Sequence, residues 1–296
     1  MRRIAAGATI AAAIALILSA CGSAGPGPSP NPGGGVPPPV VNTPPQIKSI
    51  TASEAARVEV GTPITLTALV EDAETPAANL TYAWTAETGS FSGTGAAVAW
   101  TAGPDAKTPA DVILTLTVTE RYTSAGAAAE NKVTGTTSVH LNNSPKELAD
   151  MSLRFLTNFA TSSVSPEKCV AEFSDTCNGK KDELKDITDN RHDFDILSSE
   201  LRPTAVDIAG SRTAATVHTY CSFTSRVITQ TPQSEGCRND PKSCPYKSVN
   251  TVKGDCWTTN VYQSGRWLLC TSRFTSSGSL TAFARAFFGM RGPEIP

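Results

Sequence analysis

The chain has 296 residues, 25 of them basic and 27 acidic, so no basic field exists that would attract nucleic acid. Its composition is that of an ordinary globular protein. We therefore expect one or more folded domains and no nucleic-acid partner.

Residues 1–20 have the layout of a secretory signal peptide. Arg2 and Arg3 precede an uncharged apolar run that is shorter than the about 20 residues of a comfortable membrane span. The run ends in Leu-Ser-Ala-Cys at Cys21, which resembles the lipobox of bacterial lipoproteins. The resemblance implies acylation of Cys21 and anchoring in a lipid bilayer, at the outer membrane in a Gram-negative host. The alternative is an ordinary secretory signal with an incidental cysteine.

Residues 21–45 contain no charge and are rich in proline and glycine, as in "SAGPGPSPNPGGGVPPPVVNTPP". Proline-rich pieces extend at about 3.1 Å per residue, while the three consecutive glycines bend freely. We interpret this segment as a tether that lets the folded part of the chain stand away from its point of attachment.

Residues 46–142 alternate between apolar and polar positions with a period of two. This pattern predicts about seven short antiparallel strands, the size of an immunoglobulin-like sandwich. The stretches "LTYAWTAETGSFSGTGAAVAWTAG" and "DVILTLTVTERY" resemble PKD and related Ig-like domains of bacterial surface proteins, which implies that Trp84 is the core tryptophan. The alternating positions are Ile64, Leu66, Ala68 and Val70; Leu80, Tyr82 and Trp84; Val98 and Trp100; Val112, Leu114, Leu116 and Val118; Val139 and Leu141.

An acidic cluster lies at a predicted strand end in the same region. Glu71, Asp72 and Glu74 could contribute oxygens to a calcium ion, which needs six to eight of them. The competing interpretation is a solvated acidic turn, which we favour because no second D-x-D element is present. We expect no metal and no cofactor.

Residues 144–296 read as helices followed by strands, which predicts an α+β domain. Ser144 is expected to cap a helix, with Pro145 in its first turn and Glu147 closing a capping box. Helical spacing then continues through Leu148 to Phe159, and "SPEK" and "KKDELKDITDN" predict two more helices. Five strands are expected at "FDIL", "RPTAVDIAG", "RTAATVHTYCSFTSRV", "GDCWTTNVY" and "GRWLLCTSRF".

This order resembles the NTF2-like (SnoaL-like) superfamily, in which a curved antiparallel sheet wraps round a long helix; a cystatin-like sheet is the runner-up. Secreted members of the superfamily imply a disulfide between Cys177 and Cys270 here. The resemblance also implies, as a hypothesis, a homodimer through the open face of the sheet. The whole chain is thus expected to be multidomain, an all-β Ig-like/PKD-like sandwich followed by an NTF2-like cone.

Seven cysteines follow Cys21, all between Cys169 and Cys270. Their spacings contain no C-x2-C knuckle of the kind that binds zinc, so we favour disulfides over a zinc site. A turn at Ser264 and Gly265 would place Cys256 opposite Arg273 and Cys270 opposite Thr259, so Cys256 and Cys270 would point to opposite faces. We therefore predict the pair Cys221–Cys256. A small loop would be closed by Cys237–Cys244, and Cys169 would stay free.

The sequence contains none of the common hydrolase, zinc-protease or nucleotide-binding motifs. Polar residues crowd "KDITDNRHDFD", which we interpret as a solvated loop with local Arg–Asp pairing. His218 and Tyr220 are the candidate acid–base residues, expected inside the mouth of the cone. His218, Tyr220 and Trp257 are the candidate ligand-binding residues.

Three functional interpretations remain at this point. We favour a lipid-anchored protein of the bacterial cell envelope that presents a non-catalytic head, which binds a small ligand or another envelope protein. The loop "GCRNDPKSCPYK" is then the insertion expected to touch a partner. The alternatives are a hydrolase or isomerase that uses His218 and Tyr220, and a purely structural surface spacer.

Overall fold

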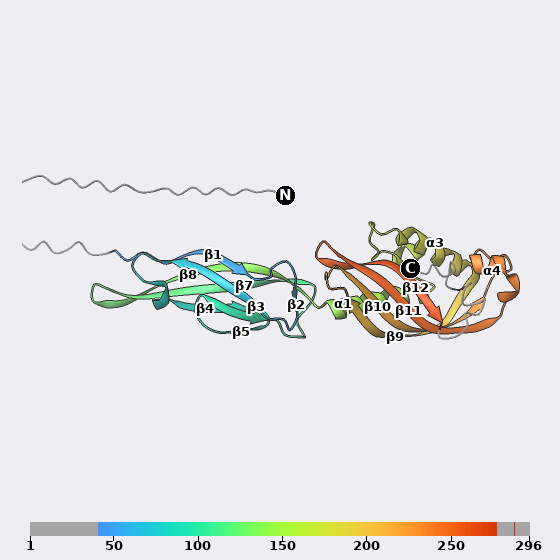
Figure 1. Cartoon of the computed structure of the whole chain (residues 1–296), viewed down its shortest axis with the longest axis horizontal. Helices are drawn as coiled ribbons and strands as arrows, with labels where there is room; N and C mark the ends of the chain where they lie inside the picture. Colours follow the sequence, from blue (N-terminus) through green and yellow to red (C-terminus); the bar gives the residue numbers. More distant parts are fainter. Residues whose placement is uncertain (1–40, 277–286, 288–296) are drawn as a thin grey trace, which may run out of the picture. The chain divides into compact units, whose positions relative to one another are not determined.

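The structure is a computed structural model that describes residues 41–276 and Phe287. The described part is mostly β-sheet, with few helices (Figure 1). Cys21, the predicted signal peptide, most of the predicted tether and all of residues 277–296 except Phe287 lie outside the described residues. No helix within the described ranges is long and apolar enough to cross a bilayer.

The first part of the fold, the two-sheet region (residues 46–142), is built from two four-stranded sheets. One sheet has the order β1-β3-β6-β5, and the other has the order β2-β8-β7-β4. The sheets pack on shared apolar clusters, to which both contribute. The strands are β1 (Gln46–Ala52), β2 (Val58–Glu59), β3 (Ile64–Glu71), β4 (Thr81–Ala86), β5 (Ser90–Ser92), β6 (Ala97–Thr101), β7 (Ala110–Ser124) and β8 (Ala127–Asn142).

Alternation along these strands decides which side chains are buried. In β3 the residues from Ile64 to Val70 alternate strictly between buried and exposed, as the sequence predicts. The tryptophan that fills the core differs from the expected one, because Trp100 is 0% exposed whereas Trp84 is only half-buried. Trp100 can be buried because its Nε1–H donates to the carbonyl oxygen of Thr88 at 3.1 Å.

A buried carboxylate, Glu120 on β7, fixes the start of the two-sheet region. Its oxygens accept hydrogen bonds from Thr75 Oγ1 at 2.7 Å, Asn42 Nδ2 at 2.8 Å and Asn131 Nδ2 at 3.0 Å. Burial alone would raise the pKa of Glu120, but these three side-chain hydrogen bonds outweigh it and lower the pKa. Asn42, near the end of the predicted tether, is thereby held against the long strand β7.

The second part, the head (residues 144–276 and Phe287), wraps a curved sheet of order β12-β11-β10-β9 round one long helix (Figure 1). The helix α1 buries its face formed by Leu148, Met151, Phe155, Leu156 and Phe159, at the spacing that the sequence predicts. The elements are α1 (Ser144–Ala160), α2 (Pro166–Cys169), α3 (Gly179–Asp193), β9 (Phe194–Ile208), β10 (Ala214–Val227), α4 (Glu235–Asn239), β11 (Val249–Gln263) and β12 (Arg266–Ser276).

The N-terminus of α1 lies one residue earlier than predicted. Asn143, and not Ser144, is the cap, and its side chain accepts a hydrogen bond from the backbone N–H of Lys146. The Ser144 hydroxyl instead donates to Glu59 at 2.6 Å. Glu147 still reaches back, but to the backbone N–H of Asn143, at 2.7 Å.

The edge strand β9 joins two predicted strands, "FDIL" and "RPTAVDIAG", into one of 15 residues. Its proline, Pro203, is tolerated because β9 lies at the edge of the sheet and the pairing with β10 shifts register between Pro203 and Ala205. The prediction of two separate strands is therefore wrong.

The β11–β12 hairpin turns at Ser264 and Gly265, whose φ angles of 50° and 78° suit a two-residue turn. The predicted register holds as far as the pair of Asn260 with Leu269. A bulge at Cys270 then shifts the register by one residue, so Cys256 faces Phe274 and not Arg273 as expected.

Three disulfides brace the head. They join Cys177 to Cys270, Cys221 to Cys256 and Cys237 to Cys244, with sequence separations of 93, 35 and 7 residues, and these are the pairs expected from the sequence. Cys169 is free and buried, and burial raises the pKa of its thiol.

Candidate functional site

The three candidate ligand-binding residues come together on the outward face of the sheet in the head. His218 on β10 pairs in register with Trp257 on β11, and their rings stack with centroids 6.4 Å apart and an interplanar angle of 19°. Tyr220 lies two residues beyond His218, on the same face of β10. All three side chains are half-buried. We call this group, with the charged residues described next, the outward cluster.

His218 lies between two carboxylates that belong to neighbouring strands. Its Nδ1 is 2.7 Å from Asp255 Oδ2 on β11, and its Nε2 is 3.7 Å from Asp207 Oδ2 on β9. The short contact to Asp255 orients the imidazole ring. His140 on β8 and His192 on α3 do not join this group.

Two guanidinium groups complete the outward cluster. Arg202 lies over the ring of Tyr220 at 4.7 Å, and Arg273 lies over the ring of Trp257 at 5.7 Å. Aromatic and arginine side chains are enriched where proteins bind partners. The outward cluster is therefore suited to recognition on an open surface.

The sequence predicts His218 and Tyr220 inside the mouth of the cone, and this placement is wrong. Strict alternation along β10 turns Val217, Thr219 and Cys221 inward, toward the helices, so the residues between them face outward. The buried disulfide to Cys221 was the sequence signal that could have fixed this orientation.

The space beneath the sheet is a small cavity of about 60 Å³ with both aromatic and polar side chains in its lining. Rings from α1 and β12 and the ring of Phe287 contribute to its wall. Ligand pockets usually measure about 300–1,000 Å³, so this cavity holds a few water molecules at most. Its lining includes Phe155, Phe159, Glu183, Ile187, Thr258, Ser272, Phe274 and Phe287, and also Trp257 and Arg273 of the outward cluster, whose strands β11 and β12 form part of its wall.

Glu183 on α3 is a cavity residue that sequence reasoning missed. Its Oε2 accepts a hydrogen bond from the Ser272 hydroxyl at 2.7 Å. Burial raises the pKa of Glu183 to about 7, and the Asp186 carboxylate adds to this rise, while hydrogen bonds from Ser272 oppose it. Its spacing of four residues from the buried Ile187 was the available signal, because such residues share one face of a helix.

Glu183 predicts a pH-dependent component of stability. Because its pKa is higher in the folded state than the about 4.3 of an exposed glutamate, its contribution is fully present below about pH 4 and is lost as the pH rises toward 7. Glu183→Gln is expected to remove this component. Thermal melts from pH 4 to 8 would show it, and a variant whose melting curve shifts with pH as the wild type does would contradict it.

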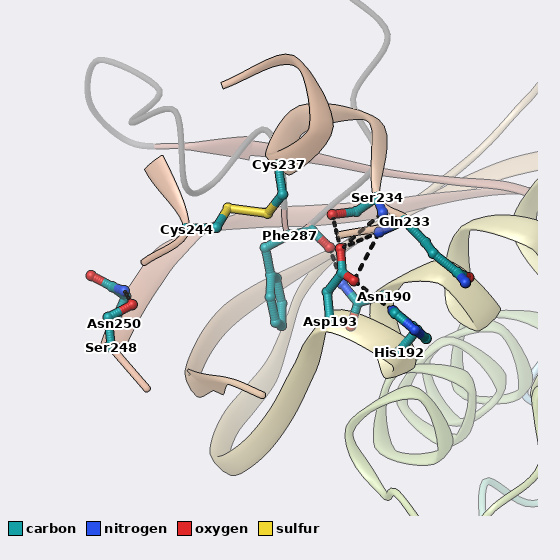
Figure 2. The surroundings of a disulfide bond; sticks show 10 residues. All are labelled: Asn190, His192, Asp193, Gln233, Ser234, Cys237, Cys244, Ser248, Asn250 and Phe287. Carbon is teal, nitrogen blue, oxygen red and sulfur yellow. Dashed lines mark hydrogen bonds and ion pairs between the residues drawn. A yellow bond between two sulfur atoms is a disulfide. The ribbon is translucent and has the colours of Figure 1, made fainter. Parts of the chain in front are cut away.

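The stretch "KDITDNRHDFD" is part of α3 and its end, and not a solvated loop as predicted. Arg191 donates hydrogen bonds to backbone carbonyls at the C-terminal end of α1, including that of Asn158 at 2.8 Å. Asp193 is fully buried and accepts bonds from His192, from the backbone N–H groups of Gln233 and Ser234, and from the Ser234 hydroxyl (Figure 2).

Asp193 therefore anchors the segment between β10 and β11, residues 228–248, which we call the insertion. Burial alone would raise the pKa of Asp193, but the hydrogen bonds from His192, Ser234 and Gln233 outweigh it and lower the pKa. The charged form is thus the one that the insertion requires. The role of this polar stretch is structural.

The carboxylates of the acidic cluster in the two-sheet region are also engaged in local hydrogen bonds and an ion pair. Asp72 caps its own turn through the backbone N–H of Glu74 at 2.9 Å, Glu74 accepts from Thr43 Oγ1 at 2.7 Å, and Glu71 pairs with Lys48 at 3.4 Å. Among residues 41–276 and Phe287, no group of three or more acidic, histidine or cysteine side chains could hold a metal ion.

Comparisons with known proteins add fold neighbours only. No family model and no curated protein matches the chain. Among solved structures, a scytalone dehydratase described as putative, from Novosphingobium aromaticivorans, is 15% identical over 45% of this chain and 83% of that chain, with a TM-score of 0.32. The intermembrane space region of the chloroplast protein ARC6 is 10% identical over 44% and 97%, with a TM-score of 0.30. A protein of unknown function from Mycobacterium tuberculosis is 11% identical over 45% and 70%, with a TM-score of 0.29.

Proposed function

We propose that the protein is a lipid-anchored protein of the bacterial cell envelope whose NTF2-like head binds a partner through the outward cluster, without catalysis. In this proposal residues 21–45 are the tether and residues 46–142 are an Ig-like, PKD-like stalk. The proposal is carried by one observation: the recognition residues gather on the open face of the sheet, while the cavity beneath it measures only about 60 Å³.

The same observation counts against the enzyme alternative. Closing an active site round a substrate excludes water from the reacting groups. His218 and Tyr220 lie on the opposite side of the sheet from the cavity. The feature that favours an enzyme is the contact of His218 with Asp255, at 2.7 Å, because an oriented imidazole can transfer protons.

The proposed location rests on two features. The Leu-Ser-Ala-Cys sequence at Cys21 is a lipid-attachment signal by its resemblance, and more than one acyl chain converts marginal membrane affinity into stable anchoring. Three disulfides support an oxidising compartment outside the cytoplasm, where such bonds persist.

The proposal is tested in bacteria that express the full chain. We expect the wild type to incorporate labelled palmitate and to sediment with membranes, and Cys21→Ser to do neither. A photo-crosslinking amino acid at position 257 is expected to give one discrete adduct, while the same amino acid at position 113, where Ile113 is 58% exposed on the two-sheet region, gives none.

Each alternative has its own outcome in that experiment. Membrane sedimentation of Cys21→Ser without palmitate in the wild type would refute the anchor. An absent adduct at position 257, together with a strict monomer in light scattering, would favour the interpretation as a structural spacer. A dimer that forms the adduct would identify a second copy of the chain as the partner. Turnover that disappears in His218→Phe/Tyr220→Phe would establish the enzyme.

A further inference from the structure

The base of the insertion forms a second hollow on the head, distinct from the outward cluster. This hollow has a volume of about 390 Å³, which lies in the usual range for ligand pockets, and it is open to solvent. It forms where the chain leaves β10 and returns before β11. Its lining residues are Arg226, Val227, Ile228, Tyr246 and Lys247.

The rim of the hollow exposes apolar side chains to solvent. Ile228 is 45% exposed, Tyr246 is 47% exposed, and the adjacent Val249 is 54% exposed. Single exposed apolar residues are ordinary, whereas exposed apolar residues that lie together are a feature of surfaces that partners cover. The hollow therefore offers an apolar contact area.

The same hollow carries two positive charges without carboxylate partners. Neither Arg226 nor Lys247 forms an ion pair within the described residues; Asp195 faces Arg226 across the β-ladder, yet the two do not pair within 4 Å. The Lys247 ammonium instead lies 5.3 Å from the centroid of the Tyr246 ring. In a chain of net charge −2, this is a local positive site that an anionic group would complement.

The frame of the hollow is held rigidly. Backbone hydrogen bonds join Lys247 N–H to the Val227 carbonyl and Val227 N–H to the Ser248 carbonyl, both at 2.9 Å. The Cys237–Cys244 disulfide closes a loop within the insertion, and Asp193 anchors the start of α4 (Figure 2). A preorganised site loses less entropy when a partner binds.

We propose that this hollow binds an acidic peptide segment, with a carboxylate between Arg226 and Lys247 and a neighbouring apolar side chain against Ile228 and Tyr246. Guanidinium and ammonium groups recognise carboxylates by charge-assisted hydrogen bonds, and the flanking apolar residues favour a peptide over a purely charged polymer. The site goes beyond the proposed function, because it lies apart from the outward cluster and would take a different ligand.

The test uses the purified full chain and a fluorescein-labelled octapeptide of alternating glutamate and leucine, followed by fluorescence polarisation. We expect saturable binding that weakens as salt rises, and no binding of the matching peptide with glutamine in place of glutamate. Arg226→Glu/Lys247→Glu is expected to weaken binding by about tenfold or more, and Tyr246→Ala by about fivefold. Circular dichroism would confirm that the variants fold.

A matched control changes the same amount of charge elsewhere. Lys107→Glu/Arg121→Glu alters two exposed basic residues of the two-sheet region and is expected to leave peptide affinity within about twofold. Absence of peptide binding to the wild type, equal binding of the glutamine peptide, or equal loss in the control variant would each overturn the proposal. Binding of phosphatidylglycerol vesicles through Arg226 and Lys247, with no peptide binding, would show that the occupant is a bilayer and would overturn it as well.

Discussion

Replacing Cys177 and Cys270 by serine is expected to lower the free energy of unfolding of the head by about 4 kcal/mol, because this disulfide closes a loop of 93 residues and removes that entropy from the unfolded chain. The melting temperature would fall by about 10 °C. The bond also fixes the bulged residue of β12 to the start of α3, where a side chain at Gly179 would collide with the Cys270 backbone. Thermal and urea unfolding of the double variant would measure the loss.

The natural control for this prediction is the short disulfide of the insertion. Replacing Cys237 and Cys244 by serine opens a loop of only 7 residues, so we expect a smaller loss of about 2 kcal/mol. The chain-entropy explanation is wrong if the short-loop variant loses as much stability as the long-loop variant.

Phe287 is expected to contribute nearly as much as the long disulfide. Its ring is 1% exposed and lies 5.3 Å from Phe194, 5.8 Å from Phe223 and 6.0 Å from Phe159, measured between ring centroids. Asn190 Nδ2 donates to its backbone carbonyl, as Figure 2 shows. Phe287→Ala is expected to cost about 3–5 kcal/mol, because it removes packing and enlarges the cavity beneath the sheet.

A variant that keeps most of the side-chain volume tests whether the loss of stability comes from lost packing. Phe287→Leu keeps most of the volume and is expected to cost less than about 1.5 kcal/mol. The enlarged cavity of Phe287→Ala should also bind a small aromatic probe such as benzene, which would raise its melting temperature but not that of the wild type. An alanine variant as stable as the wild type would mean that the ring is not part of the core.

The sequence was informative wherever local periodicity decides the structure. Alternation in β3 and the spacing of Leu148 to Phe159 depend only on which face of an element is buried, so burial could be predicted residue by residue there. The hairpin turn at Ser264 and Gly265 fixed the register of the residues next to it for the same reason.

Features that depend on distant parts of the chain could not be predicted in this way. The bulge at Cys270 lies where β12 contacts the start of α3, and the continuity of β9 past Pro203 is possible because β9 lies at the edge of the sheet. Filling of the cavity by Phe287 requires a residue far along the chain from α1. The outward cluster could be assembled from the sequence, but its side of the sheet was predicted wrongly, because the burial of the Cys221–Cys256 pair was not taken into account.

The hydrogen bond from Asn42 to Glu120 has a mechanical consequence. If the tether is pulled from an anchored end, tension arrives at Asn42 and divides between β1 and, through Glu120, the β7–β8 hairpin. That hairpin has 15 paired positions and continues directly into the helix of the head, so it offers many hydrogen bonds to resist shear. A domain attached in this manner is expected to stretch its tether fully before any strand separates.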